Sequence, residues 1–543
     1  MATMTRRFGV TPRVLRASRR ASTQSIRFSV ASRFHSSSAH PRRPHIRDDP
    51  SDSVESTEGP KTPLLTVPPA YTLHDNEIHC FLGVNGSGKS KLLQRIQDVA
   101  AAMPRSSQSP RVGTLSFEAH RAFVGEHGDR VVAEVLGGVG SPTARDLIVR
   151  LGLYPVWESK VRHLSTGEVR KVMLAVALLK VPRSTVLIMD QPFDGLDVAA
   201  RKQLEWMLGQ LTRGFTRLLV DFGGRNEAFA YKTQVLLVAN RLEQVFPEIL
   251  THVVLKRKDN ESLESEKKED AVEIVQWEDP EKPESMLARL RAFFENEATQ
   301  HGTELAEEDV KTLVRRLYSS KAEPSSDGAS TRQIAIELHE VSIAYGRRLL
   351  LEDVVFKRHR HEHWALLGPN GSGKSSLMRV LTQSDGHGQV GGTVRVHGER
   401  IAVVSTDQHL EMLSRPEWKD RTALDWLQLN AQDSERVEVV TELLGISSNL
   451  LPRRFNELSQ GEQKLIQIAS ALVGRPDVLI LDEITHGLDM WNRARVLQVI
   501  NAVGVEASTQ THLILITHHE DEIVECFQSV FEIQDQSLVE RER

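Results

Sequence analysis

The chain has 543 residues, of which 40% are hydrophobic and 26% charged, with a formal net charge of −5. These values are ordinary for a globular protein and exclude a fibrous or wholly disordered chain. No apolar run approaches the ~18–20 residues that a membrane helix needs, so a soluble protein without a transmembrane segment is expected. The two cysteines, Cys80 and Cys526, are too far apart to suggest metal-ligand spacing or a disulfide framework.

The first 47 residues differ from the rest. They contain eleven arginines and many serines, but no lysine, aspartate or glutamate. This composition is typical of a mitochondrial transit peptide, so residues 1–47 are expected to be disordered and the protein to reach the mitochondrial matrix. The alternative is a basic tail that binds nucleic acid or acidic lipid. Without those eleven arginines, 57 of the 68 basic residues would face 73 acidic ones, so a nucleic-acid partner is not expected.

A phosphate-binding loop occurs twice, as GVNGSGKS at 83–90 and GPNGSGKS at 368–375. Both match the pattern G-x-x-x-x-G-K-[ST], in which glycines let the backbone N–H groups surround phosphate oxygens. The helix that follows directs its positive dipole end at the same charge. The predicted nucleotide-binding residues of these loops are Gly83, Asn85, Gly86, Ser87, Gly88, Lys89 and Ser90, and Gly368, Asn370, Gly371, Ser372, Gly373, Lys374 and Ser375.

Further motifs follow each loop in the same order. LSTGE at 164–168 and LSQGE at 458–462 open amphipathic helices predicted at 169–179 and 463–472. Short apolar runs at 185–189 and 478–481 come next and predict buried parallel strands. These strands end at Asp190 and Asp482, and a GLD triplet follows each of them. An internal repeat of this kind indicates two large domains.

This order of motifs resembles the ATP-binding-cassette family over residues 63–255 and 332–540, here named the first and second cassettes. The resemblance implies two α/β P-loop domains in tandem, each with a parallel-sheet core and a helical subdomain. It also implies that two ATP molecules with Mg²⁺ lie between cassettes paired head to tail. Each ATP would contact the P-loop of one cassette and the LSxGE helix of the other, since donors at a helix N-terminus suit a γ-phosphate.

Site two is defined by the second P-loop. The resemblance implies that Ser375 and Asp482 hold Mg²⁺, that Glu483 polarises the attacking water, and that His518 contacts the γ-phosphate. Tyr345, 23 residues before the second P-loop, is the expected adenine-stacking ring. Ser165 and Gly167 of the first cassette would complete this site.

Site one is defined by the first P-loop, with Ser90 and Asp190 as the expected Mg²⁺ ligands. Ser459 and Gly461 of the second cassette would complete it. Gln191 stands where site two has Glu483, and an amide can neither take up a proton nor carry the charge. Asn240 is the expected counterpart of His518. Site one is therefore predicted to bind ATP and hydrolyse it slowly or not at all.

Within the family, residues 164–171 and 191–199 resemble the ModF and photorepair-protein group of tandem cassettes without membrane domains, as a fungal, mitochondrial-type relative. This suggests an ATPase whose partner is an unidentified protein or membrane component, with a transport system as one possibility. Three alternatives stay open: a ribosome-associated translation factor, an ATPase subunit for a separate channel, and a nucleotide-gated binding module with little hydrolysis.

The remaining segments are a polar leader at 48–62 and a linker at 256–331. The linker holds 12 basic and 19 acidic residues, and its first part, to residue 283, is expected to be mobile. Apolar residues at helical spacing near 286–294 and 310–317 predict two helices that pack on one of the cassettes.

Overall fold

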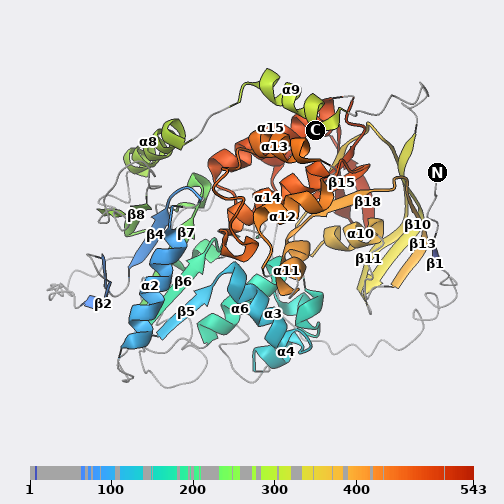
Figure 1. Ribbon diagram of the computed structural model, residues 1–543. Helices are drawn as coiled ribbons and strands as arrows, with labels where there is room; N and C mark the ends of the chain where they lie inside the picture. Colours follow the sequence, from blue (N-terminus) through green and yellow to red (C-terminus); the bar gives the residue numbers. More distant parts are fainter. Residues whose placement is uncertain are drawn as a thin grey trace, which may run out of the picture.

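The chain contains two parallel-sheet cassettes that lie side by side in the computed structural model (Figure 1). Among the described residues, no helix is long and apolar enough to cross a membrane. The structure describes residues 6–8, 63–67, 71–74, 77–85, 87–103, 111–137, 148–149, 151–164, 166–179, 184–193, 196, 201–202, 204–206, 208–209, 232–246, 249–256, 272–276, 283–301, 305–319, 333–345, 348–369, 371–382, 389–415, 420–431, 433–506 and 508–542.

The central sheets of the two cassettes have the same strand order. The first sheet runs β5 (Arg111–Leu115), β6 (Ser184–Asp190), β7 (Lys232–Ala239), β4 (Ile78–Leu82), β8 (His252–Lys256) and β9 (Val272–Gln276). The second runs β14 (Ile401–Val404), β15 (Val478–Asp482), β16 (His512–Ile516), β12 (Trp364–Leu367), β17 (Ser529–Gln534) and β18 (Ser537–Arg541). In both, five parallel strands are followed by one antiparallel edge strand. The predicted α/β fold with parallel-sheet cores is confirmed.

Each P-loop joins a buried central strand to a helix. The helix α2 (Lys89–Ala102) follows β4, and α10 (Lys374–Leu381) follows β12. The residues that precede these helices, Gly88 and Gly373, have φ values of 88° and 112°, which only glycine adopts at little cost. The loops therefore need glycine at this position to turn their N–H groups inward.

Further helices follow the P-loop helix in each cassette. In the first cassette they are α3 (Phe117–His127), α4 (Val132–Val135) and α6 (Thr166–Leu179). In the second they are α11 (Thr406–Ser414), α12 (Ala423–Asn430), α13 (Ser434–Leu444), α14 (Gln460–Val473) and α15 (Met490–Val505). The helices α3, α6, α11 and α14 contact the edge strands β5 and β14. Single 3₁₀ turns are described at Tyr154–Val156, Val161–His163, Leu242–Gln244, Phe455–Glu457 and Glu520–Glu522.

Smaller antiparallel sheets accompany the central ones. The first cassette has the hairpin β2 (Pro63–Val67) and β3 (Tyr71–His74). The second has β10 (Ile334–Tyr345) between β11 (Arg348–His359) and β13 (Gln389–Val396). A three-residue strand, β1 (Arg6–Phe8), pairs with β13. The rest of the predicted transit peptide and the leader lie outside the described residues.

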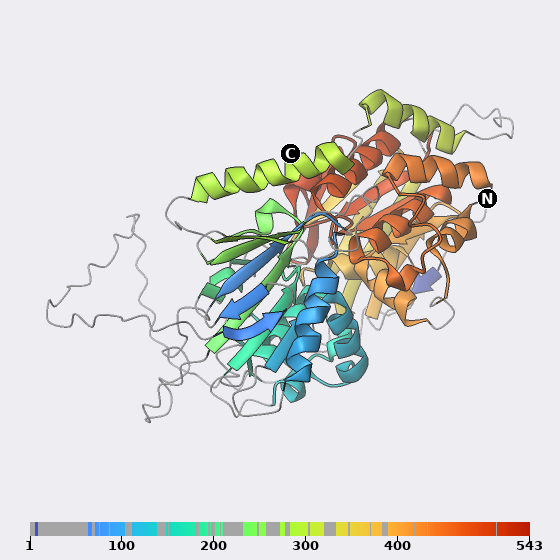
Figure 2. The ribbon, with the colours of Figure 1, turned by 60° about the vertical axis from the view of Figure 1, so that its left-hand side comes forward.

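The linker is divided between the cassettes rather than packed on one of them. The strand β9 pairs with β8 and so continues the central sheet of the first cassette beyond residue 255. The helix α8 (Pro283–His301) packs its apolar side on the core of the first cassette. The helix α9 (Glu307–Tyr318) packs instead against α13 and α15 of the second (Figure 2). Its apolar residues are buried on one face, as their spacing predicted.

Candidate functional site

Both P-loops hold their lysine in the same place. The Nζ atom of Lys89 donates hydrogen bonds to the carbonyl oxygens of Gly83 and Val84, at 2.6 and 2.9 Å. The Nζ atom of Lys374 donates to the carbonyl oxygens of Gly368 and Pro369, at 2.7 and 2.9 Å. Each ammonium group therefore lies inside its own loop, at the position where phosphate would sit.

The described loop residues fit a phosphate group. The hydroxyl oxygens of Ser87 and Ser372 are buried and have no hydrogen-bond partner among the described residues, so each loop offers a donor without an acceptor. Burial lowers the pKa of Lys89 to about 8, although Asp489 and Asp190 oppose the change. A bound phosphate would supply the missing acceptor and stabilise the charged lysine.

The predicted metal ligands Ser90 and Ser375 lie in the first turns of α2 and α10, and Asp190 and Asp482 end β6 and β15. Burial, reinforced by Glu483 and other acidic neighbours, raises the pKa of Asp482 to about 8. A divalent cation at this position would favour the ionised form. This environment therefore fits the assigned Mg²⁺ ligand.

Glu483 lies among histidines. Its carboxylate oxygens are 3.0 Å from Nδ1 of His486 and 3.3 Å from Nδ1 of His518. Burial acts to raise the pKa of Glu483, but the two histidines outweigh it and hold the pKa well below its usual range. The group is thus an ionised carboxylate that can accept a hydrogen bond from water. His518 follows β16, as predicted; the contact of His486 was not predicted.

Gln191 of site one adopts the same backbone conformation as Glu483. Their φ values are 50° and 49°, and their N–H groups donate to the carbonyl oxygens of Val238 and Ile516, at 3.0 and 2.9 Å. The two positions are therefore equivalent in the duplicated fold, and only the functional group differs. The same register holds for the neighbouring strands, where Asp190 pairs with Val238 and Asp482 with Ile516.

Asn240 occupies the position of His518. Each of these residues lies two places beyond the strand residue that pairs with the aspartate. The side-chain amide of Asn240 donates to Oδ1 of Asn85 in the P-loop, at 3.1 Å. The Oε1 atom of Gln191 is buried without a hydrogen-bond partner among the described residues. Site one thus keeps polar groups around the nucleotide position but replaces both the carboxylate and the imidazole with amides.

Site one is formed by both cassettes. The backbone N–H of Asn85 donates to Oδ2 of Asp489 at 2.8 Å, and its side chain donates to the carbonyl oxygen of Gly487 at 3.1 Å. A Cβ atom on Gly461 would overlap the amide of Asn85 and lie 2.6 Å from the Gly487 carbonyl oxygen. The LSQGE helix of the second cassette therefore faces the first P-loop, as the resemblance implied, and the close approach requires glycine.

The other predicted site residues are placed less completely. Ser459 caps α14, and its hydroxyl accepts from the backbone N–H of Glu462. Gly167 is buried in the first turn of α6. Tyr345 ends β10, but its side chain lies outside the described part of the chain. Gly86, Ser165 and Asn370 also lie outside it. The contact of Ser165 and Gly167 with nucleotide on the second P-loop therefore stays a prediction.

Arg241 is a functional candidate that the sequence did not reveal. It is buried in the first cassette, and its Nε atom donates to the carbonyl oxygen of Leu488 in the second, at 3.2 Å. Its Nη2 atom donates to the carbonyl oxygen and the hydroxyl of Thr485. Arg241 therefore holds the loop that follows Glu483. A residue just after Asn240 carries no sequence signal for this contact, since its partners are more than 240 positions away.

Comparison with known proteins agrees with the geometry. The family model described as ABC transporter matches residues 68–194 and 351–486, one match in each cassette. A solved structure described as a model of ribosome-bound archaeal Pelota and ABCE1 has a TM-score of 0.53 and 17% identity. It covers 86% of this chain and 76% of that one. At this identity the likeness shows the fold alone.

Two curated relatives match both cassettes. The ABC transporter ATP-binding protein ModF of Escherichia coli is 28% identical over 84% of this chain and 91% of its own length. A putative ABC transporter ATP-binding protein of Enterococcus faecalis is 24% identical over 81% and 82%. With two P-loops, two LSxGE helices and a nucleotide site shared between the cassettes, the chain belongs to the ATP-binding-cassette family as a tandem-cassette ATPase similar to ModF.

Proposed function

We propose that this ATPase retains one ATP at site one and hydrolyses ATP, with Mg²⁺, at site two. The observation that carries the proposal is the equivalence of Gln191 and Glu483. Both have the same backbone conformation and the same strand hydrogen bond, yet only Glu483 is a carboxylate. Water activation needs a group that can take up a proton, and an amide cannot do so.

The residues of site two would act together. Lys374 and the N–H groups at the start of α10 would bind the outer phosphates, and Ser375 and Asp482 would hold Mg²⁺. Bound Mg²⁺ would neutralise charge that develops on the transferred phosphoryl group. Glu483 would orient and polarise the attacking water, and His518 would donate to the γ-phosphate.

Site one would instead act as a clamp. Lys89 is positioned for the phosphates, while Asp489 and Gly461 of the second cassette lie against the same loop. Nucleotide at this place would contact both cassettes and so favour their closed arrangement. Hydrolysis at site two would then open that half of the interface while site one stays associated.

Nucleotide retention tests the asymmetry. Wild-type protein loaded with ATP and diluted rapidly should retain about one unhydrolysed ATP per chain, because one of two sites lacks its base. Lys89→Ala should abolish retention, whereas the matched Lys374→Ala should abolish turnover and keep the retained ATP. Gln191→Glu should raise total turnover. Loss of all ATP, or equal hydrolysis of two nucleotides, would contradict the clamp.

The driven process is proposed from the relatives. Similarity to a protein named ABC transporter ATP-binding protein supports a role as the ATP-binding component of a transport system that acts on a separate membrane partner. A ribosome-associated role is the alternative. The charge of the linker does not support a ribosome-associated role. Residues 256–331 hold 19 acidic and 12 basic residues, and a net negative charge does not favour contact with phosphate-rich RNA.

We also propose a mitochondrial location, which rests on the composition of residues 1–47. A fusion of this segment to a fluorescent reporter should enter mitochondria. A matched fusion in which the eleven arginines are replaced by glutamine should remain in the cytosol, because import signals of this class depend on positive charge. Cytosolic localisation of both the wild-type fusion and the full chain would contradict the transit peptide and favour the basic-tail alternative.

A further inference from the structure

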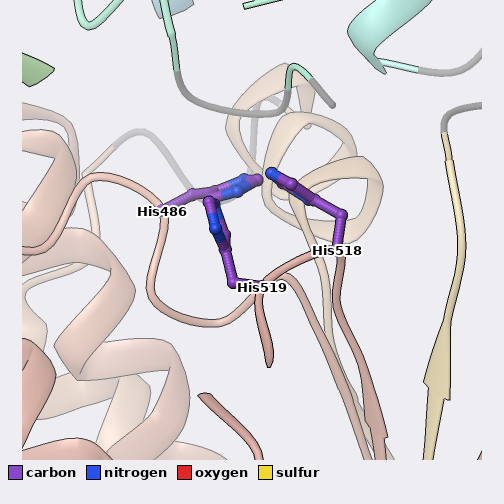
Figure 3. A group of neighbouring side chains, drawn as sticks. All are labelled: His486, His518 and His519. Carbon is purple, nitrogen blue, oxygen red and sulfur yellow. The ribbon is translucent and has the colours of Figure 1, made fainter. Parts of the chain in front are cut away.

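Three histidines converge beside Glu483. His486 lies in the loop after β15, and His518 and His519 lie in the loop after β16; their rings point toward one another (Figure 3). The ring centroids of His486 and His518 are 5.5 Å apart, and those of His518 and His519 are 4.0 Å apart. One ligand atom from each of the three imidazoles lies within 4.8 Å of the others. Separate loops thus bring three metal-binding groups to one point.

His518 lacks a hydrogen-bond partner at this point. Its side chain is 3% exposed, and both ring nitrogens are buried without a hydrogen bond to the described residues. The Oε1 atom of Glu483 lies 3.3 Å from Nδ1, an ion-pair distance if the ring is protonated, and Nε2 has no such neighbour among the described residues. A buried polar atom left unpaired costs about 1–3 kcal/mol, so this imidazole is suited to a ligand that enters the cluster.

We propose that His486, His518 and His519 bind a divalent transition-metal ion of the zinc class, and that the bound ion inhibits hydrolysis at site two. Three imidazoles with one open position are a common coordination set for Zn²⁺, and Glu483 or water would supply the fourth ligand. Mg²⁺ prefers oxygen ligands and would not compete for this cluster.

Inhibition follows from the position of the cluster. A metal bound to His518 would withdraw that imidazole from the γ-phosphate, and coordination by Glu483 would remove the carboxylate from water. Metal and ATP would then oppose each other's binding, since coupling between two ligands is reciprocal. The inhibitory half of this inference rests on the proposed function of site two, whereas metal binding itself does not.

The cluster belongs to the second cassette only. When the two cassettes are aligned on Gln191 and Glu483 and on Asn240 and His518, the first cassette has no histidine at the three equivalent positions. These positions hold Asp194, Asn240 and Arg241, the last of which is permanently charged. Site one would therefore not bind such an ion. The regulation would act on the hydrolysing site and leave the retaining site unchanged.

A second cluster in the described residues must be distinguished from this one. Glu77, His79 and His252 lie near the start of β4 and β8, with ligand atoms within 4.8 Å of one another. There, Oε2 of Glu77 is 2.9 Å from Nε2 of His79 and accepts from the backbone N–H of His74 at 3.2 Å. The Nδ1 atom of His252 is 3.1 Å from the hydroxyl oxygen of Thr251. Because these groups already have hydrogen-bond partners, we assign them a structural role, and His252→Asn serves as the matched control.

Metal binding is measured on the chelator-treated, nucleotide-free full chain. Co²⁺ should bind and give the visible absorption of a tetrahedral site, and Zn²⁺ should displace it. His519→Asn should weaken this binding at least about tenfold, as expected for the loss of a ligand, while His252→Asn should leave it unchanged. Binding that survives His519→Asn, that is lost in His252→Asn, or that never appears would overturn the proposal.

Inhibition is measured as the ratio of turnover with and without Zn²⁺ at a fixed excess of Mg²⁺ and ATP. Wild type should be inhibited, and the ratio for His519→Asn should approach one. Because any binding of Zn²⁺ to ATP would lower the turnover of both proteins equally, the difference between them reports only the metal site. Equal inhibition of both proteins would overturn the regulatory half. If Glu483→Gln proved fully active while Co²⁺ still bound, the proposed function would fail and the metal site would stand.

Discussion

Glu483→Gln should lower steady-state ATP turnover by about 10²- to 10³-fold, within the range that general-base catalysis contributes. The carboxylate is ionised beside His486 and His518, whereas the amide would have no basic group to accept a proton from water. Nucleotide contacts stay in place, so the variant should bind ATP and accumulate in the closed state. A steady-state turnover assay checks the loss of hydrolysis. Small-angle scattering, which reports ATP-dependent compaction of the chain, checks the accumulation of the closed state.

The equivalent position of the first cassette indicates that this backbone conformation accommodates glutamine. Gln191 has the φ value of Glu483 and the same hydrogen bond from its N–H, so the substitution should not damage the fold. Glu438→Gln, at an exposed position of α13, makes the same chemical change away from the site and should be neutral. Turnover of Glu483→Gln within twofold of wild type would show that the hydrolytic site is assigned wrongly.

Arg241→Ala should lower turnover at site two about tenfold or more, although Arg241 belongs to the first cassette. The substitution removes hydrogen bonds from a buried guanidinium to Leu488 and Thr485, each of which is worth about 1.5–3 kcal/mol when a charged group takes part. These bonds hold the loop between Glu483 and Asp489. Single-turnover kinetics should show slower hydrolysis with little change in ATP binding at site two.

The conservative variant separates charge from geometry. Arg241→Lys keeps the charge but loses the planar fork, so it should recover only part of the rate. Arg130→Ala, at an exposed position of the first cassette, should leave turnover unchanged. If Arg241→Ala hydrolysed ATP at the wild-type rate while its thermal unfolding also matched wild type, the loop would not link the sites.

The loop from Glu483 to Asp489 connects the two candidate nucleotide sites among the described residues. It begins at Glu483 in site two and reaches Asp489, which accepts a hydrogen bond from the P-loop of site one. Thr485, between them, also bonds to the buried Glu522. Nucleotide that repositions the first P-loop would therefore shift Glu483, the proposed base, through the seven consecutive residues 483–489.

Local sequence patterns were enough to predict the duplicated fold, the two P-loops and the difference between the sites. These features are encoded by neighbouring residues: glycines that allow positive φ, apolar runs that form buried strands, and the one residue after each aspartate. Because each signal is local, spacing along the chain was enough to predict it. The opposition of Gly461 and the first P-loop came instead from family resemblance.

Contacts between residues far apart in the sequence could not be predicted and depend on how the two cassettes pack. Asn85 and Asp489 lie 404 positions apart, and no spacing rule predicts their hydrogen bond. The pairing of β9 with β8 and the separate docking of α8 and α9 likewise depend on which apolar surfaces each sheet leaves uncovered. The three histidines beside Glu483 come from two loops that meet only because β15 and β16 are adjacent strands whose ends reach the same edge of the sheet.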